Sequence, residues 1–510
     1  MSKKKPTPKK ATKKKTATTK AAKPRRKKLR GLSDIRRYFH RNEEPVYFVS
    51  ATNFNLLGLD EWVGNFKFVN YIDCFDGHHP HVFCPPEIPH EPFESIEDIN
   101  NYLLRHPDVQ NLIHAGNHPA RAVFLMFDQD TEKLAKELDL QVCFPPAKLR
   151  DAVDDKINAT RIGNRAGVKS VPNALAKVSS WAELKQAAKG LGRDWVIQTA
   201  FGDSGHTTFF IKNERDYKKH AQEINEAPEV KIMKRIDCRQ TAIEACVTRH
   251  GTIVGPLMTE LVGFKELTPY KGGWCGNEVF DDAFDKTVRT QARKMTFKFG
   301  EELRKMGYRG YFELDLLQDK KTDELYLGEV NPRITGVSSM TNLAAFAHAD
   351  APLFLFHLLE YMGVPYDLDV DDLNKRWADP DNIDSWSQLV IKHTDDDVRM
   401  ISAAPRTGIY EIDSEGRMHF MRVQTHRRTV QSGNRAFFLR IAKEGDYFYE
   451  GADIGILVVR GRLMDDRFKL TRRAKAWITA VRSNYQSRPL VGRDANAAEQ
   501  KAEVGGFKLL

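Results

Sequence analysis

Apolar and polar positions alternate along two consecutive segments just beyond the middle of the chain. They span residues 311–317 and 326–331, and a short polar, turn-prone run separates them. A period of two is typical of strands, and a short polar connection between two such segments predicts a β-hairpin. Side chains two residues apart on a strand share a face, so Glu329 and Asn331 should lie together, with Asp315 approaching from the partner strand.

This predicted hairpin brings two carboxylates and an amide to one place. Hard divalent cations such as Mg²⁺ prefer oxygen ligands and usually keep substrate phosphates in their coordination shell. The pattern therefore predicts that Asp315, Glu329 and Asn331 hold a metal ion beside a nucleotide. The simpler alternative is a solvated sheet face on which acidic and apolar residues alternate.

Several segments upstream of the hairpin also have recognisable patterns. Residues 151–167 have apolar positions at helical spacing, with acids at the start and Gly167 at the end, which predicts a helix carrying Lys156. A Ser-x-x-Glu capping box begins another helix at Ser180. Two strands then flank a small-residue loop at residues 201–206, where backbone N–H groups can approach phosphate oxygens.

Taken in order, these segments resemble the ATP-grasp superfamily, in the form found in biotin carboxylases and carboxylate-amine ligases. The resemblance implies ATP and Mg²⁺ or Mn²⁺ as cofactors, with Arg333 stabilising an acid or its acyl phosphate. The positions that it places at the nucleotide are Lys156, Gln198, Gly202, Ser204, Gly205, Lys234 and Ile236. Many members carry a lysine where this chain has Gln198, and glutamine brings a hydrogen bond but no charge.

The expected fold combines α/β and α+β domains. Strand-like and helical segments alternate between residues 31 and 150, which predicts a largely parallel sheet of the kind that precedes ATP-grasp cores. The resemblance places an ATP-grasp domain of two α+β subdomains at 151–366, and a mixed C-terminal domain similar to that of biotin carboxylases at 367–488. Residues 489–510 are expected to be flexible.

Charge is concentrated at the N-terminus. Residues 1–30 contain 15 Lys and Arg and no acid, and removing them from the net charge of +10 leaves −5 for the rest. The composition of this segment predicts disorder. Such an arm can bind nucleic acid non-specifically through its phosphates, and the alternative is a solubility tail without a partner.

The remaining composition limits where the chain would work. No apolar run is long enough to span a bilayer, and no apolar signal-peptide core follows the N-terminus, so no membrane partner is expected. The six cysteines are scattered without a Cys-x-x-Cys pair, which suits a reducing cytoplasm.

The resemblance implies an ADP-forming ligase. Such an enzyme phosphorylates a carboxylate or bicarbonate, and an amine or another nucleophile attacks the resulting acyl phosphate. The rival hypothesis is a non-catalytic ATP-binding sensor or structural protein on the same scaffold, associated with nucleic acid through its basic tail. Gln198 favours the rival, whereas the joint presence of Asp315, Glu329, Asn331 and Arg333 favours the enzyme.

Overall fold

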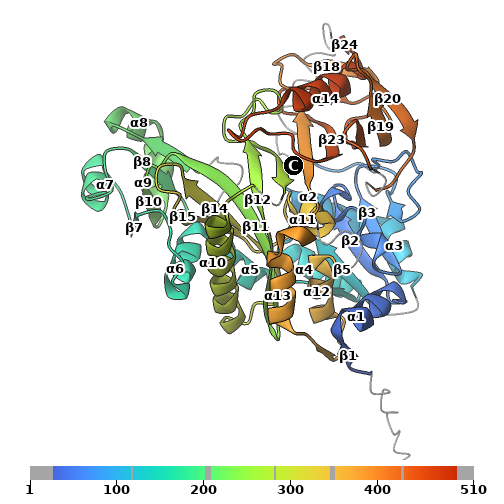
Figure 1. Ribbon diagram of the computed structural model, residues 1–510, viewed down its shortest axis with the longest axis horizontal. Helices are drawn as coiled ribbons and strands as arrows, with labels where there is room; N and C mark the ends of the chain where they lie inside the picture. Colours follow the sequence, from blue (N-terminus) through green and yellow to red (C-terminus); the bar gives the residue numbers. More distant parts are fainter. Residues whose placement is uncertain are drawn as a thin grey trace, which may run out of the picture.

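The computed structural model describes residues 27–116, 119–201, 208–280, 283–344, 351–426 and 430–490 (Figure 1). Among these residues, no helix is both long enough and apolar enough to cross a membrane. The basic segment lies mostly outside the described residues. Its end does not, because Leu29–Arg30 forms a short strand, β1, parallel to β16 (Tyr366–Asp367). The expected disorder therefore does not reach residue 30.

The N-terminal layer is a five-stranded parallel sheet, as the alternating pattern predicted. Its strand order is β4-β3-β2-β5-β6. Strands β2 and β5 are buried along their whole length, as expected for a parallel sheet with helices on both faces. The strands are β2 (Val46–Ser50), β3 (Phe66–Asn70), β4 (Val82–Phe83), β5 (Ala120–Phe124) and β6 (Leu140–Val142), and the helices are α1 (Gly31–His40), α2 (Ile96–Arg105), α3 (Pro107–His114) and α4 (Gln129–Glu137).

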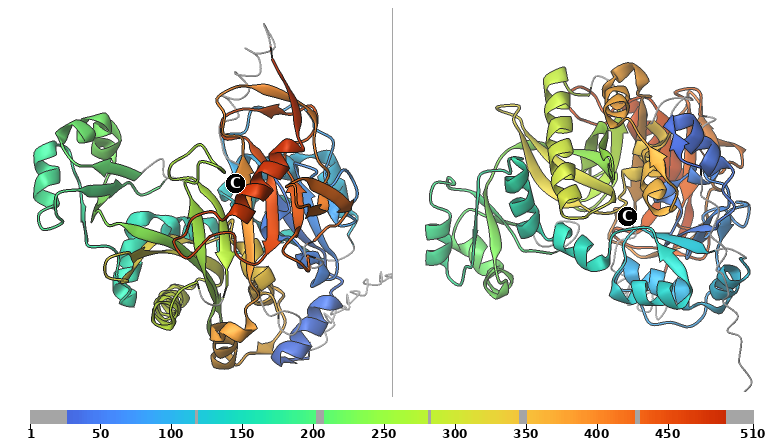
Figure 2. Two further views of the ribbon diagram at one scale, coloured as in Figure 1. Left: turned by 45° about the horizontal axis from the view of Figure 1, so that its top comes forward. Right: turned by 90° about the horizontal axis from the view of Figure 1, so that it is seen from below.

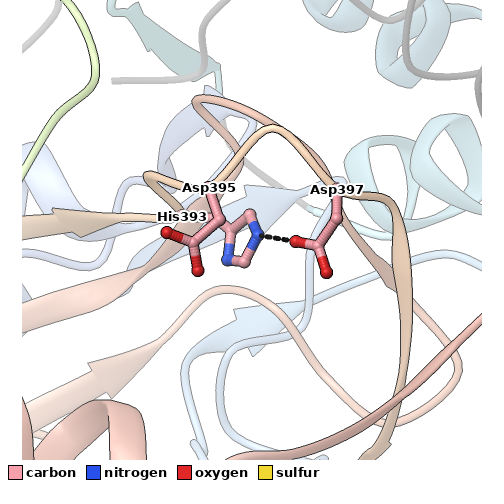
Figure 3. A group of neighbouring side chains, drawn as sticks. All are labelled: His393, Asp395 and Asp397. Carbon is pink, nitrogen blue, oxygen red and sulfur yellow. Dashed lines mark hydrogen bonds and ion pairs between the residues drawn. The ribbon is translucent and has the colours of Figure 1, made fainter.

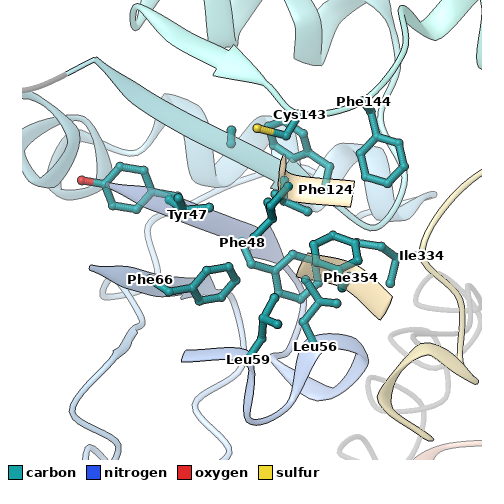
Figure 4. Close-up of a cluster of buried hydrophobic side chains, with 14 of the residues drawn as sticks. Tyr47, Phe48, Leu56, Leu59, Phe66, Phe124, Cys143, Phe144, Ile334 and Phe354 are labelled. Atoms are coloured by element: carbon teal, nitrogen blue, oxygen red, sulfur yellow. The ribbon is translucent and has the colours of Figure 1, made fainter. Parts of the chain in front are cut away.

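The core of this layer continues into the centre of the molecule. Figure 4 shows Phe48 and Phe124 of the parallel sheet beside Ile334 and Phe354, which come from segments more than 200 residues later in the sequence. His357 makes a polar link at the same junction, since it hydrogen-bonds both the Cys143 carbonyl and the Tyr311 N–H. The first layer is thus packed directly against the part of the chain that follows the predicted metal hairpin.

A small antiparallel sheet forms the lobe at the left of Figures 1 and 2. Its strand order is β7-β10-β8-β9. Half of the predicted capping box is present: the Ser180 hydroxyl accepts a hydrogen bond from the Glu183 N–H, whereas the Glu183 carboxylate accepts from the Ser179 N–H and not from that of Ser180. The strands are β7 (Asn173–Ala176), β8 (Trp195–Gln198), β9 (Thr208–Ile211) and β10 (Val230–Lys234), and the helices are α7 (Trp181–Ala187), α8 (Glu214–Lys219) and α9 (Ala221–Glu226).

A ten-stranded antiparallel sheet organises the rest of the molecule, in the order β15-β14-β11-β12-β13-β17-β23-β21-β19-β20. Strands β13 and β17 pair directly, so strands on both sides of the predicted boundary at residues 366 and 367 belong to one sheet. The strands are β11 (Cys238–Thr248), β12 (Gly251–Val262), β13 (Trp274–Val279), β14 (Gly310–Asp319), β15 (Leu325–Asn331), β17 (Trp386–Lys392), β19 (Gly408–Ile412), β20 (Met418–Arg422), β21 (Arg435–Arg440) and β23 (Asp453–Arg460).

Helices cover this large sheet. The longest, α10 (Lys286–Lys305), packs its buried residues Ala292, Phe299 and Leu303 with Val254 and Ile243 of the sheet. The other elements of this part are α11 (Ser338–Ala344), α12 (Leu353–Tyr361), α13 (Val370–Ala378), α14 (Arg472–Ser483), β18 (Arg399–Ala403), β22 (Tyr447–Phe448) and β24 (Gln486–Pro489).

The helix predicted at residues 151–167 is two helices. They are α5 (Ala147–Asp154) and α6 (Lys156–Ala166), and the chain changes direction at Asp155. Asp155 has a non-helical backbone conformation, and its carboxylate accepts hydrogen bonds from the N–H groups of Ile157 and Asn158 at 2.8 and 2.9 Å. A side-chain cap of this kind starts a new helix, so a continuous helix was the wrong prediction.

Candidate active site

The break at Asp155 fixes the position of Lys156. As the first residue of α6, Lys156 donates its backbone N–H to the Ala200 carbonyl at 2.9 Å, which ties the helix start to the end of the β8 segment. Its side chain is buried, and its ammonium nitrogen lies 2.6 Å from Glu329 Oε1. The predicted nucleotide lysine and a predicted metal ligand therefore meet.

The predicted hairpin forms, with a one-residue register shift (a β-bulge) between the pairs at Leu316 and Asp315 that the alternating pattern did not predict. Asp315 of β14 is paired with Glu329 of β15, and Glu313 with Asn331. The Asn331 amide nitrogen lies 3.3 Å from Asp315 Oδ2 and 3.3 Å from Glu313 Oε2. Arg333 donates to Asn331 Oδ1 at 2.8 Å. Lys156, Asp315, Glu329, Asn331 and Arg333 thus form one connected group at the edge of the large sheet.

Two further carboxylates belong to this group and were missed in the sequence. Each of Glu260, Glu313 and Asp315 has a carboxylate oxygen that lies within 4.8 Å of one from each of the other two. Strand β11 separates β12 from β14, but it presents the small Ala242 opposite Asp315, which leaves room for Glu260. Glu313 could have been found from its place two residues before Asp315, whereas Glu260 required knowledge of the strand order.

The electrostatics of these carboxylates favour a cation. Burial raises the pKa of Asp315 to about 7, and the Glu329 carboxylate adds to the effect. Burial and the neighbouring carboxylates also raise the pKa values of Glu313 and Glu260 well above their usual range. A divalent ion among these oxygens would stabilise their ionised forms and reverse the upward shifts. The donor set therefore fits a hard cation such as Mg²⁺.

A buried hydrogen-bond network holds the segment that follows Arg333. Glu244 of β11 accepts hydrogen bonds from the Tyr311 hydroxyl at 2.6 Å, from Thr335 at 3.1 Å and from Ser338 at 2.5 Å. Burial raises the pKa of Glu244 to about 7. Because these hydroxyls come from β14 and from the start of α11, the network fixes where the chain goes after Arg333.

The small sheet contributes a second lysine that the sequence analysis did not select. Lys231 of β10 is the direct cross-strand neighbour of Gln198 on β8. Its ammonium donates to the Gly328 carbonyl of β15 at 3.4 Å, which brings the small sheet to the hairpin. Burial lowers the pKa of Lys231 to about 8; the Glu329 carboxylate opposes this shift, and the Lys156 charge adds to it.

The other predicted nucleotide residues are less closely connected to the hairpin. The Gln198 side-chain amide donates to the Thr208 hydroxyl at 3.2 Å. Its Oε1 is buried without a hydrogen bond among the described residues. Lys234 and Ile236 lie at and just beyond the end of β10, and the Lys234 side chain is exposed. Gly202, Ser204 and Gly205 lie outside the described residues.

A separate group of possible metal ligands lies after β17. Figure 3 shows His393, Asp395 and Asp397, whose ligand atoms lie within 4.8 Å of one another. His393 pairs with Asp397 at 3.2 Å and stacks on Phe448. Both aspartates are exposed, and neither belongs to the hairpin group, so we assign this cluster no role in the site.

The fold defines a structural class. The combination of a parallel N-terminal layer, a small antiparallel lobe and an acidic hairpin is that of the ATP-grasp fold in its biotin carboxylase-like form, and comparison with solved structures shows this likeness. No protein-family model matches the sequence, and no curated protein matches it significantly. The likeness is therefore one of structure.

Three solved structures illustrate it. Biotin carboxylase from Campylobacter jejuni, in a β,γ-ATP complex, has a TM-score of 0.58 at 14% identity and covers 87% of this chain and 92% of its own. The biotin carboxylase domain of 2-oxoglutarate carboxylase from Hydrogenobacter thermophilus, with MgADP, ADP and bicarbonate, has a TM-score of 0.58 at 13% identity, over 92% and 96%. N5-carboxyaminoimidazole ribonucleotide synthetase from Thermotoga maritima has a TM-score of 0.52 at 13% identity, over 88% and 100%.

Proposed function

We propose that this protein is an ATP-dependent ligase that forms ADP. In the first step a carboxylate or bicarbonate oxygen attacks the γ-phosphorus of ATP, the bond to the β-phosphate oxygen breaks, and ADP leaves. In the second step an amine or another nucleophile attacks the acyl carbon, and inorganic phosphate leaves. The observation that carries the proposal is the convergence of Lys156, Asp315, Glu329, Asn331 and Arg333 on one hairpin.

The acidic residues would hold the metal. Asp315, Glu329 and Asn331 present oxygen atoms on one sheet face, and Glu313 and Glu260 add negative charge beside them. Bound Mg²⁺ or Mn²⁺ supplies charge neutralisation at the phosphates. The pKa values of Asp315 and Glu313, which burial and the neighbouring carboxylates raise, support this role, because buried carboxylates that close together need a cation to stay ionised.

The basic residues would bind and orient the anions. Lys156 is already directed to Glu329, so its ammonium lies where phosphate oxygens would meet the metal ligands. Arg333 is half-buried, and its Nε has no hydrogen bond among the described residues. A planar guanidinium with a donor to spare suits a carboxylate or an acyl phosphate. Phosphoryl transfer needs this positioning more than it needs covalent catalysis by the protein.

The remaining nucleotide contacts follow from the same assignment. We place Gln198, Lys234 and Ile236 at the nucleotide, together with the loop residues Gly202, Ser204 and Gly205. The nucleotide complexes of the two biotin carboxylase-type neighbours support ATP, and the bicarbonate in one of them supports a small acid as substrate. The six cysteines are free, which supports a reducing cytoplasm as the place of action.

Acid-dependent release of ADP tests the proposal. The full chain is incubated with ATP and Mg²⁺, and bicarbonate or pooled carboxylic acids are added with and without pooled amines. We expect ADP release that depends on an acid. Arg333→Lys should bind ATP but lose much of the acid-dependent rate, because a point charge cannot reproduce bidentate contacts.

The matched control is Arg435→Lys, which alters an arginine paired with Glu411 in the C-terminal part of the sheet. Its rate should equal that of the wild type. Tight ATP binding without ADP release in any pool would instead favour the non-catalytic ATP-binding protein.

A further inference from the structure

Lys231 is a buried cation, and no described carboxylate lies within ion-pair distance of it. Its relative exposure is 1%, and no ion pair to it is found among the described residues. The hydrogen bond that it makes, to the Gly328 carbonyl, is long at 3.4 Å. Burying an ammonium without a counter-ion costs free energy, so this residue reduces the stability of the fold unless something else compensates.

The surroundings of Lys231 identify what would compensate. Gly328 directly precedes Glu329, and Glu329 already pairs with Lys156 at 2.6 Å. Two buried lysines thus lie close to Glu329 at the place where the small sheet meets the hairpin, and only Lys156 forms an ion pair with it among the described residues. An anion placed between β10 and β15 would be attracted by both ammonium groups, and a polyphosphate is an anion of suitable charge.

The cross-strand register places the Lys231 ammonium on the same side of the small sheet as Gln198. Lys231 and Gln198 are direct partners in the antiparallel pair of β10 and β8, so their side chains share a face of the small sheet. An ammonium at either position can therefore reach the same anion. Gln198 itself brings no charge, and it hydrogen-bonds to Thr208.

We propose that Lys231 binds a phosphate oxygen of a nucleoside diphosphate or triphosphate, and that it supplies from β10 the positive charge that Gln198 does not supply from β8. This inference rests on the proposed nucleotide site and adds a residue to it. It also gives the buried ammonium a function that a purely structural residue would not have.

Lys231→Met separates binding from stability. Methionine is of similar length and removes the buried charge, so the melting temperature without nucleotide should stay the same or rise. Affinity for ATP and for ADP, measured by calorimetry, should fall by about 10- to 100-fold, the scale of one charge-assisted hydrogen bond. Affinity for adenosine should not change, because adenosine carries no phosphate.

Two further variants make the test specific. Lys231→Met combined with Gln198→Lys should recover most of the affinity for ATP, since the ammonium returns from the neighbouring strand. Gln198→Lys alone should not tighten binding, because it places like charges opposite each other. The control is Lys212→Met, an exposed lysine just after β9, which should bind ATP as the wild type does.

The inference would be overturned if Lys231→Met bound ATP and ADP as tightly as the wild type does. It would also be overturned if the variant melted at a lower temperature and lost as much affinity for adenosine as for ATP. These results differ from a failure of the proposed function. In that case the wild-type chain would bind neither ATP nor ADP, and the role of Lys231 would fall with it.

Discussion

At the scale of single residues, the shared position of Lys156 and Glu329 determines much of the site. Their charged atoms lie 2.6 Å apart, and 6% of the Lys156 side chain and 29% of the Glu329 side chain are exposed. Removing one member of such a pair leaves the other charge partly buried without compensation. Substitutions here should therefore preserve size and hydrogen-bonding capacity, as Glu→Gln does.

His357 gives a residue-scale prediction about pH. Its Nδ1 accepts from the Tyr311 N–H, so the proton is on Nε2, which donates to the Cys143 carbonyl. Burial lowers the pKa of His357 to about 3. The unfolded chain takes up a proton below about pH 6.5, whereas the folded chain does not. The contribution of His357 to stability is therefore complete above about pH 6.5 and is lost as the pH falls toward 3.

Urea unfolding of the wild type and of His357→Gln at pH 7.5 and pH 5.0 measures this contribution. The stability difference between the two proteins should be about 2 kcal/mol smaller at pH 5.0, following about 1.4 kcal/mol per pH unit below pH 6.5. A difference that does not change with pH would show that His357 takes up its proton in the folded protein as readily as in the unfolded chain.

The sequence predicted some residues of the site but not others, for a physical reason. Asp315, Glu329 and Asn331 are close because a hairpin is local, although the register shift that sets Asp315 opposite Glu329 is not encoded in the alternation. Glu260 and Lys231 reach the site through strand pairings that depend on the whole sheet order. No local pattern encodes such pairings, so these two residues could be recognised only in the structure.

At the scale of elements, the helix break at Asp155 shows how a short capping signal can be hidden in a helical pattern. Apolar spacing continues through the break, and it predicted one helix where there are two. The consecutive aspartates Asp154 and Asp155 are the signal, because aspartate favours the position before a helix begins. The break matters for the proposed site, since it makes Lys156 the first residue of α6.

Asp155→Ala tests the importance of this cap. It should lower the free energy of unfolding by about 1 kcal/mol, the usual cost of losing a side-chain cap, and it should also weaken ATP binding because Lys156 loses its fixed position. Asp155→Asn keeps the acceptor oxygen and should retain both properties. Equal ATP affinity of the two variants in calorimetry would show that the cap does not position Lys156.

At the scale of the whole molecule, the site lies where three parts of the chain meet. The large sheet supplies the hairpin, helix α6 supplies Lys156, and the small sheet supplies Lys231. The parallel layer packs against the segment after Arg333 through Ile334 and Phe354 (Figure 4). The sequence predicted the parallel layer from its alternating pattern, but not that the central and C-terminal strands form one sheet. That continuity depends on the β13 and β17 pairing, between segments about 100 residues apart.

The central claim is that the hairpin carries a metal-dependent nucleotide site, and Glu329→Gln tests it most directly. The measurement is Mg²⁺-dependent ADP release by the wild type and by Glu329→Gln. The control is Glu324→Gln, which alters a half-buried carboxylate at the turn of the same hairpin that pairs with Lys169. We expect Glu329→Gln to lose nearly all Mg²⁺-dependent turnover, because the lost carboxylate charge weakens metal binding at the phosphates, while its circular dichroism spectrum and melting curve stay close to those of the wild type. Glu324→Gln should retain full turnover. If Glu329→Gln keeps its ATP binding, its Mg²⁺ dependence and its turnover, the hairpin is a solvated sheet face and the account is wrong.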